Sequence, residues 1–259
     1  MKTRKLLMSG MLAFSLCQSA VAQSESAVPI TVGDITTMID DYLSPDNKGR
    51  ITVEDISALI DRYLQQGVSN CPDSNHPHAI DLGLPSGTKW ACCNIGASSP
   101  EGYGGYYAWG ETEEKSVYGW DTYKYGSGYG ELTKYSTRVD NKTQLDLSDD
   151  VAYVKWGGSW RMPTIDHQNE LLNNCSSEWA EESGVSGRRF TGPNGASVFL
   201  PAAGHDLYSA GLDGNYWSSS LTPNSEKCAF YLCFTSSLVL VDGYYFLRPV
   251  GLSVRAVCP

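Results

Sequence analysis

The chain has 259 residues, a formal net charge of −10 at pH 7, 19% charged residues and 11% aromatic residues. This acidic balance lacks the basic surface that binds phosphate backbones, so we expect no nucleic-acid partner. The 26 glycines and 16 tyrosines indicate a loop-rich fold that contains β-structure, and the chain is long enough for one full domain and a small one.

The first 22 residues have the pattern of a secretory signal peptide. A basic start precedes an apolar stretch and a small-residue cleavage site: Lys2, Arg4 and Lys5, then residues 6–16, then Ala20 to Ala22. Cleavage would start the mature chain at Gln23 with a net charge of −13. A lipid-modified Cys17 is the weaker alternative, because the preceding Leu16 is not small. No later segment is long and apolar enough to span a bilayer, so we expect a secreted, periplasmic or outer-surface protein.

A 14-residue pattern at Ile30–Leu43 recurs 21 residues later at Ile51–Leu64. In both copies the apolar residues recur at helical spacing, which predicts two short amphipathic helices that pack on each other. Thr31 and Thr52 are the expected N-caps of these helices.

This repeat resembles a type I dockerin, a module of two calcium-loop-and-helix units that docks onto a cohesin partner. If Gly49 is position six of a calcium loop, Ser44, Asp46, Lys48 and Asp55 fall at positions one, three, five and twelve. The lysine stands where a carboxylate is needed, and only Asp46 and Asp55 remain as side-chain metal ligands. We therefore expect a metal-free helical pair that binds a cohesin-like anchoring partner, with calcium binding as the alternative.

The sequence divides into a signal peptide (1–22), a dockerin-like repeat (23–68), a linker (69–78) and a large domain (79–259). Glycine, serine and proline without periodicity mark the linker. All seven tryptophans follow it, so the two parts differ in composition.

Three local patterns predict secondary structure in the large domain. A turn at Pro85–Gly87 between apolar runs predicts a hairpin, and a second turn at Gly192–Gly195 predicts another. Between them, Thr164 after Pro163 is placed to cap a helix that would bury Leu171.

Three motifs, Ser159–Thr164, Tyr216–Ser219 and Gly251–Arg255, resemble the C-type-lectin-like domains of Bacteroidetes surface proteins. These are related to the Fibrobacter major paralogous domain and to the formylglycine-generating-enzyme fold. The resemblance implies an α+β fold, so the expected architecture is a C-type-lectin-like domain after a two-helix dockerin-like module. The calcium-sugar tripeptides of true C-type lectins are absent, so calcium-bridged sugar binding is not expected.

The last 32 residues, Cys228–Pro259, contain no Lys, Glu, Gln, Met or Trp. Because antiparallel strands usually alternate apolar and polar residues, we expect part of this apolar stretch to face outward as a binding surface. Aromatic rings are the expected anchors, whereas Trp217 is assigned to the core. The candidate ligand-binding residues are Phe230, Cys233, Thr235, Ser237, Leu238, Leu240, Asp242, Tyr244, Tyr245, Phe246 and Leu247.

The same compositional gap has a second interpretation. Some members of this lectin-like family are targets of diversity-generating retroelements, which randomise adenines within AAC-type codons near the C-terminal end. Substituting the first two bases of such a codon never gives Lys, Glu, Gln, Met or Trp. The alternative is that buried strands avoid Lys, Glu and Gln in any case.

Seven cysteines follow the signal peptide, an odd number that leaves at least one thiol free or bridged between chains, with open connectivity. Neighbours in a strand point to opposite faces, so we expect at most one of Cys92 and Cys93 in the core. The four histidines show no metal-ligand spacing, and His76 and His78 fall in the expected linker.

Together these features predict a secreted or surface-displayed protein that binds a protein or glycan through its C-terminal face, without catalytic residues or a cofactor. The alternative is an extracytoplasmic enzyme on the same fold, either a formylglycine-type oxidase or a hydrolase that uses His205. The oxidase's copper-binding cysteine pair has no clear counterpart here. No nucleophile elbow surrounds Ser218 to Ser220.

Overall fold

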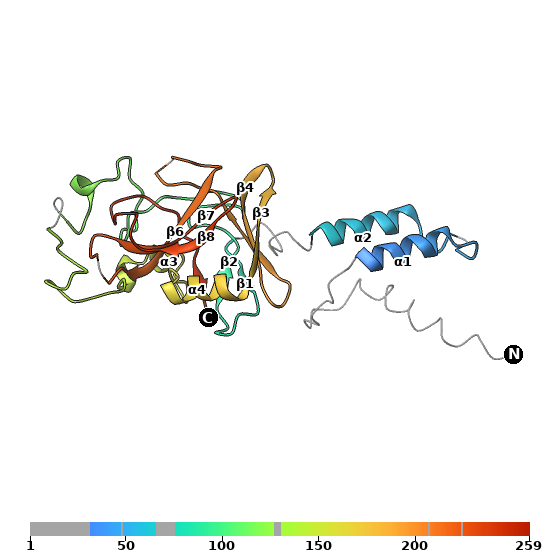
Figure 1. Ribbon diagram of the computed structural model, residues 1–259, viewed down its shortest axis with the longest axis horizontal. Helices are drawn as coiled ribbons and strands as arrows, with labels where there is room; N and C mark the ends of the chain where they lie inside the picture. The colour runs from blue at the N-terminus through green and yellow to red at the C-terminus, as the bar shows by residue number, and fades with distance from the viewer. Residues whose placement is uncertain (1–31, 48, 66–75, 127–130, 207, 224) are drawn as a thin grey trace.

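The computed structural model describes residues 32–47, 49–65, 76–126, 131–206, 208–223 and 225–259 (Figure 1). The expected signal peptide, the Thr31 cap, Lys48 of the calcium-loop alignment and Cys71 lie outside the described residues. Helices and antiparallel sheets are both present, which confirms the predicted α+β class. None of the described helices combines the length and apolar character needed to cross a membrane.

The two helices predicted from the repeat are α1 (Val32–Leu43) and α2 (Val53–Gln65), and they pack against each other. Their connection is organised by Asn47, whose amide donates to the carbonyls of Tyr42 and Ile51 and accepts from the Ile51 N–H at 2.8 Å. Thr52 caps α2 as predicted, because its hydroxyl accepts the Asp55 N–H at 3.2 Å.

The described residues from His76 onward form nine strands, two further α-helices and two short 3-10 helices, η1 (Trp120–Thr122) and η2 (Leu147–Asp149) (Figure 1). The strands make three antiparallel sheets, ordered β1-β2-β9, β3-β4-β5 and β6-β7-β8. Their bounds are β1 Ala79–Asp81, β2 Lys89–Ala91, β3 Ser176–Glu182, β4 Val185–Thr191, β5 Ser197–Pro201, β6 Asp213–Leu221, β7 Ala229–Thr235, β8 Val239–Asp242 and β9 Val257–Cys258. Both predicted hairpins, β1-β2 and β4-β5, are therefore confirmed.

The helices α3 (Val151–Trp156) and α4 (Ile165–Asn174) are held by side-chain caps. Thr164 and His167 form a reciprocal capping box at the start of α4, which confirms the predicted cap. Buried Asp150 caps α3 and also accepts the Met162 N–H at 2.9 Å. The segment between the two helices is thereby tied to the start of α3.

Both faces of the β6-β7-β8 sheet are covered by apolar side chains. Because successive strand residues point to opposite faces, Trp217 and Tyr231 enter one core cluster, whereas Tyr216, Leu232 and Phe234 enter another. The predicted burial of Trp217 is confirmed. Much of the apolar composition of the C-terminal stretch therefore comes from a sheet buried on two sides, and β7 contributes no exposed residue to the part that was expected to face outward.

Two arginines near the C-terminus are fully buried and join distant segments. Arg255 donates to the carbonyls of Ala91 at 2.9 Å and Phe199 at 2.8 Å, and to the Asn94 side chain at 2.8 Å. Arg248 donates to the Tyr123 hydroxyl and to backbone carbonyls that include Tyr135. Hydrogen bonds of this kind offset part of the cost of burying a charge.

The described cysteines correct one expectation. Cys92 and Cys93 are both buried in the same core cluster, because both sides of the segment after β2 are covered. Cys175, Cys228, Cys233 and Cys258 form no disulfide with any described residue.

Candidate functional site

The predicted ligand-binding residues lie on β7, β8 and the two turns that flank β8, and only some of them face solvent. Ser237, Leu238, Tyr244 and Tyr245 are exposed, and Tyr244 and Tyr245 keep 60% and 75% of their surface. Partial burial applies to the residues Phe230, Cys233, Thr235, Leu240, Asp242 and Leu247.

Phe246 is a core residue, which corrects its prediction as a binding anchor. Only 8% of its surface is exposed, and its ring packs edge-on against Tyr231 with centroids 5.0 Å apart. The half-buried ring of Phe230 lies 2.7 Å from where a Cβ on Gly243 would stand. These two rings therefore pack beneath the turn that carries Tyr244 and Tyr245 and do not project into solvent.

Tyr244 and Tyr245 stand on a turn whose backbone is fixed by internal hydrogen bonds. One Asp242 carboxylate oxygen accepts the N–H groups of Gly243 at 2.6 Å and Tyr244 at 3.0 Å, and the other accepts the Tyr231 hydroxyl at 3.1 Å. The Thr222 hydroxyl donates to the Gly243 carbonyl at 2.6 Å. Asp242 thus holds the turn, a structural role that was not predicted, and its ligand contact stays a prediction.

The turn between β7 and β8 is fixed in a similar way. The Thr235 hydroxyl accepts the N–H groups of Ser237 and Leu238 at 3.3 and 3.2 Å. Arg188 on β4 donates to the Thr235 carbonyl at 2.9 Å. Thr235 and Arg188 therefore place Leu238, which is 48% exposed, on a defined turn.

Tyr208 was missed by the sequence analysis and joins the exposed tyrosines through a chain of ring contacts. Ring centroids are 5.0 Å apart between Tyr245 and Phe246, 5.0 Å between Phe246 and His205, and 6.0 Å between His205 and Tyr208. Tyr208 is 71% exposed. We call Tyr208, Tyr244 and Tyr245 the tyrosine patch.

The loop that carries Tyr208 is pinned by its neighbour Asp206. The Asp206 N–H donates to the Gly251 carbonyl at 2.9 Å, and the Asp206 carboxylate accepts the Gly251 N–H. Burial raises the pKa of this carboxyl, although the bond from Gly251 opposes the shift. No periodicity marks Tyr208 in the sequence, and only the return of the chain at Gly251 places its loop beside the C-terminal turn.

A polar cleft of about 810 Å³ lies beside the segment that follows the patch. Its lining is Glu131, Leu132, Ser136, Thr137, Arg138, Ser225, Glu226 and Lys227. The Arg248 N–H donates to the Lys227 carbonyl at 2.9 Å, so one wall of the cleft is paired with the chain just after Leu247. Glu226 crosses the cleft to accept the Thr137 N–H at 2.7 Å.

The residues considered for hydrolysis are not gathered into a catalytic arrangement. The Ser219 hydroxyl donates to the Pro163 carbonyl, and the Ser220 hydroxyl accepts the Ile165 N–H at 3.1 Å. None of the described hydrogen bonds links these serines to His205. Its imidazole instead lies between aromatic rings, with the Ser209 hydroxyl 3.5 Å away.

The two predicted calcium ligands have other surroundings. Asp55 accepts the N–H and the hydroxyl of Thr52 at 2.8 and 2.9 Å, and the bond to the Thr52 N–H is the main cause of its lowered pKa. Arg50 donates to the Asp46 carbonyl. In the described residues, Asp46 and Asp55 belong to no group of three or more side chains that could share a metal ion.

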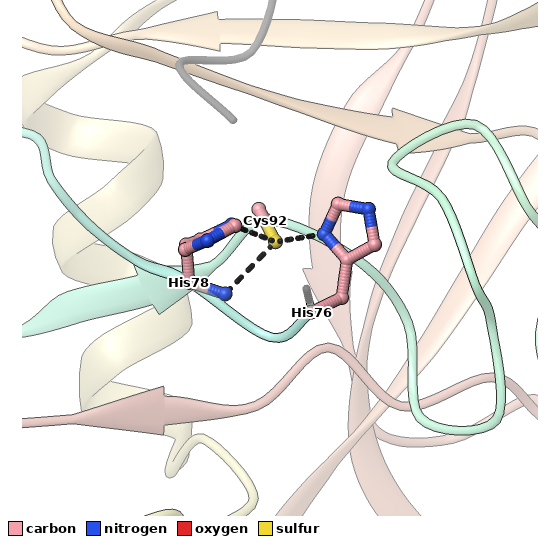
Figure 2. Close-up of side chains that lie close together, drawn as sticks. All are labelled: His76, His78 and Cys92. Carbon is pink, nitrogen blue, oxygen red and sulfur yellow. Dashed lines mark hydrogen bonds between the residues drawn. The ribbon is translucent and has the colours of Figure 1, made fainter. Parts of the chain in front are cut away.

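A different group of potential ligands converges at the start of β1, where the sequence analysis saw no ligand spacing. The Nδ1 atoms of His76 and His78 lie 3.3 and 3.8 Å from the Cys92 sulfur, and all three potential ligand atoms lie within 4.8 Å of one another (Figure 2). Cys92 is buried and both histidines are half-buried. The fold therefore assembles a group that the linear spacing of the histidines does not reveal.

The motifs behind the proposed lectin-like resemblance occupy framework positions. Thr164 caps α4, Trp217 is buried on β6, and Arg255 joins β2 to β5. Comparison of the chain with protein-family models, curated proteins and solved structures found no match in any of the three.

Proposed function

We propose that this is an exported binding protein with a dockerin-like helical pair and a C-type-lectin-like domain, and that it holds a partner protein against the tyrosine patch. The observation that carries the proposal is the exposure of Tyr244, Tyr208 and Tyr245, at 60%, 71% and 75%, on turns that half-buried aspartates fix. Such rings bury a large area when a partner covers them, on the order of 150–250 Å² each.

The fixed turns lower the entropic cost of binding. Asp242 holds the turn of Tyr244 and Tyr245, and Asp206 holds the loop of Tyr208, so little backbone freedom is left to lose when a partner docks. Tyrosine adds few rotatable bonds of its own and offers a hydroxyl at the rim of the contact. Exposed Leu212, in the same loop as Tyr208, widens the apolar surface, which favours a protein over a single sugar ring.

A glycan is the second candidate, and the polar cleft favours it. Sugars are recognised by aromatic faces together with side chains that bond to hydroxyl groups, and the lining of the cleft includes Ser225 and the charged Arg138 and Glu226. The Arg248–Lys227 backbone bond keeps this wall next to the chain that carries Tyr245. The calcium-sugar tripeptides remain absent, so sugar binding here would not use calcium.

The structure limits the diversification hypothesis to fewer variable positions. Variation is tolerated where side chains face solvent, so the proposed variable positions are Ser237, Leu238, Tyr244 and Tyr245. Core residues such as Leu232 and Phe234 would remain constant, because changes of volume in a packed core are costly. A near-copy of the coding segment with AAC at the exposed codons, beside a reverse transcriptase gene, would support this hypothesis, and its absence would remove it.

The test uses immobilised mature protein, residues 23–259, and intact cells as the source of ligand. Retention of cells should fall more than tenfold for the Tyr244→Ser/Tyr245→Ser variant and stay unchanged for Leu147→Ser, an exposed apolar residue outside the patch. Protease treatment of the cells abolishes retention if the ligand is a protein, and glycosidase treatment abolishes it if the ligand is a glycan. Equal retention by the tyrosine variant would contradict the proposal.

A further inference from the structure

We propose that His76, His78 and Cys92 bind one zinc ion, at a site separate from the tyrosine patch and independent of its function. The Cys92 sulfur lies between the two imidazoles, with Nδ1 distances of 3.3 Å to His76 and 3.8 Å to His78. The two ring centroids are 5.4 Å apart (Figure 2). The three side chains therefore surround one small volume from three sides.

The register of the first hairpin produces this convergence. Ala79 pairs with Ala91, so the next position along the antiparallel ladder places His78 opposite Cys92. The Cys92 N–H donates to the His78 carbonyl at 2.9 Å, which extends the pairing by one step. His76 lies two residues before His78, and residues two apart in extended backbone share a face, so its ring reaches the same sulfur although segment 76–78 is not a regular strand.

The spacing of the ligand atoms fits a tetrahedral zinc ion. With Zn–S near 2.3 Å and Zn–N near 2.0–2.1 Å, the sulfur and a nitrogen on tetrahedral zinc are about 3.6 Å apart. The two sulfur-to-nitrogen distances, 3.3 and 3.8 Å, lie on either side of that value. The three ligand atoms lie within 4.8 Å of one another, so an ion would draw the side chains together around itself.

The chemistry of the donors selects the type of metal. One thiolate and two imidazoles suit zinc and related transition metals, whereas calcium and magnesium prefer carboxylate and carbonyl oxygens. Binding replaces the thiol proton of Cys92 by the ion and releases that proton to solvent. The His78 N–H, 3.1 Å from the sulfur, donates to it and stabilises the thiolate. The described residues thus supply three of the four ligands that a tetrahedral zinc ion takes.

The two histidines are half-buried and Cys92 is buried, so the ion would enter from the histidine side. The site would connect the segment before β1 to the residue that follows β2, at the start of the part of the chain that forms the three sheets. Binding would therefore stabilise the folded chain.

The experiment titrates the reduced mature chain, residues 23–259, with Co²⁺ as a spectroscopic probe and then displaces it with Zn²⁺. We expect one Co²⁺ per chain, a thiolate-to-cobalt charge-transfer band, visible bands of tetrahedral cobalt, and their loss when Zn²⁺ is added. His76→Gln, His78→Gln and Cys92→Ala should each weaken binding beyond the roughly 10–100-fold that loss of an outer hydrogen-bond partner causes.

Two variants serve as matched controls. His167→Gln keeps the side-chain type that a capping box accepts and should bind Co²⁺ like the parent, and Cys233→Ala removes a thiol outside the group. Zn²⁺ should raise the thermal midpoint of the parent and both controls, and leave His76→Gln and His78→Gln unchanged. If Cys92→Ala does not fold, the two histidine variants decide. No charge-transfer band in the parent, or bands that persist in both histidine variants, would overturn the proposal.

Discussion

At the scale of single residues, the exposed tyrosines depend on neighbouring residues that are partly or fully buried. Tyr244 and Tyr245 are placed by Asp242 and Gly243, and Tyr208 is placed by Asp206. None of these three supporting roles was predicted, because the apolar C-terminal pattern predicted Asp242 as a ligand contact and Phe246 as a surface anchor. Hydrogen bonds between a turn and its own backbone leave no periodic signal, so only the folded geometry separates a supporting residue from a contacting one.

Gly243 is a position where one methyl group should matter. A Cβ there would meet the Phe230 ring at 2.7 Å and the Thr222 hydroxyl at 2.8 Å. Gly243→Ala should therefore lower the free energy of unfolding by about 1–3 kcal/mol, the usual cost of overpacking, and shift the turn of the tyrosine patch. Denaturant unfolding measures this effect. Gly119→Ala, with open space around its Cβ, should change stability by much less.

Asp149 should contribute to the acid sensitivity of the fold. Burial alone would raise its pKa, but bonds from Lys134, Tyr125 and Tyr135 outweigh it and lower the pKa from 3.8 to about 2. A lowered folded-state pKa gives stability that is present above pH 4 and is lost as the pH falls toward 2. The loss between pH 4 and pH 2 should be about 2 kcal/mol.

The measurement is urea unfolding between pH 2 and pH 6. Asp149→Asn should flatten the dependence below pH 4, whereas Asp121→Asn, which alters an exposed carboxylate, should follow the parent. If the free energy of unfolding falls equally with pH in the parent and in Asp149→Asn, the Asp149 carboxylate is not the cause of the acid sensitivity.

At the scale of elements, the sequence predicted what local chemistry determines. The repeat predicted α1 and α2, the turn residues predicted the β1-β2 and β4-β5 hairpins, and Thr164 predicted the start of α4. The sequence pattern did not predict the burial of β7, whose apolar residues lie on both of its faces because both faces are covered. The pairing of His78 with Cys92 follows once the hairpin register is known, but the approach of His76 does not.

The helical pair offers a test of the metal-free interpretation. Asp55 accepts two hydrogen bonds from Thr52 at the start of α2, so Asp55→Ala should reduce helix stability through loss of this capping interaction. Calcium should not change the thermal unfolding of the parent or of the variant. Glu54→Ala, the neighbouring exposed carboxylate in the first turn, is the matched control. Stabilisation by calcium that Asp55→Ala abolishes would restore the calcium-loop interpretation.

At the scale of the whole molecule, the C-terminal segment joins the β1-β2-β9 sheet to the β3-β4-β5 sheet through hydrogen bonds from Arg255. Arg255 connects β2 and β5 through the carbonyls of Ala91 and Phe199, and its pKa is lowered by burial. Sequence alone indicated that Gly251–Arg255 was a motif but not what its arginine bonded to, because its partners are more than fifty residues away in the chain. Long-range contacts of this kind cannot be derived from local pattern.

Arg255→Met should therefore destabilise the molecule by about 3–5 kcal/mol, because buried carbonyls lose their donors. Thermal unfolding followed by near-ultraviolet circular dichroism reports this loss. Arg138→Met, at an exposed arginine of the cleft, is the control and should leave the midpoint close to that of the parent. A midpoint unchanged in Arg255→Met would mean that these bonds contribute little.

The central claim, that the tyrosine patch is the binding surface, is tested most directly by dissociation constants for the isolated cell-surface ligand. Tyr245→Ala should weaken binding by at least about 1.4 kcal/mol, or tenfold, as expected for a central aromatic anchor. Leu147→Ala, outside the patch, should match the parent. Identical constants for the parent, Tyr245→Ala and Tyr208→Ala would contradict the account.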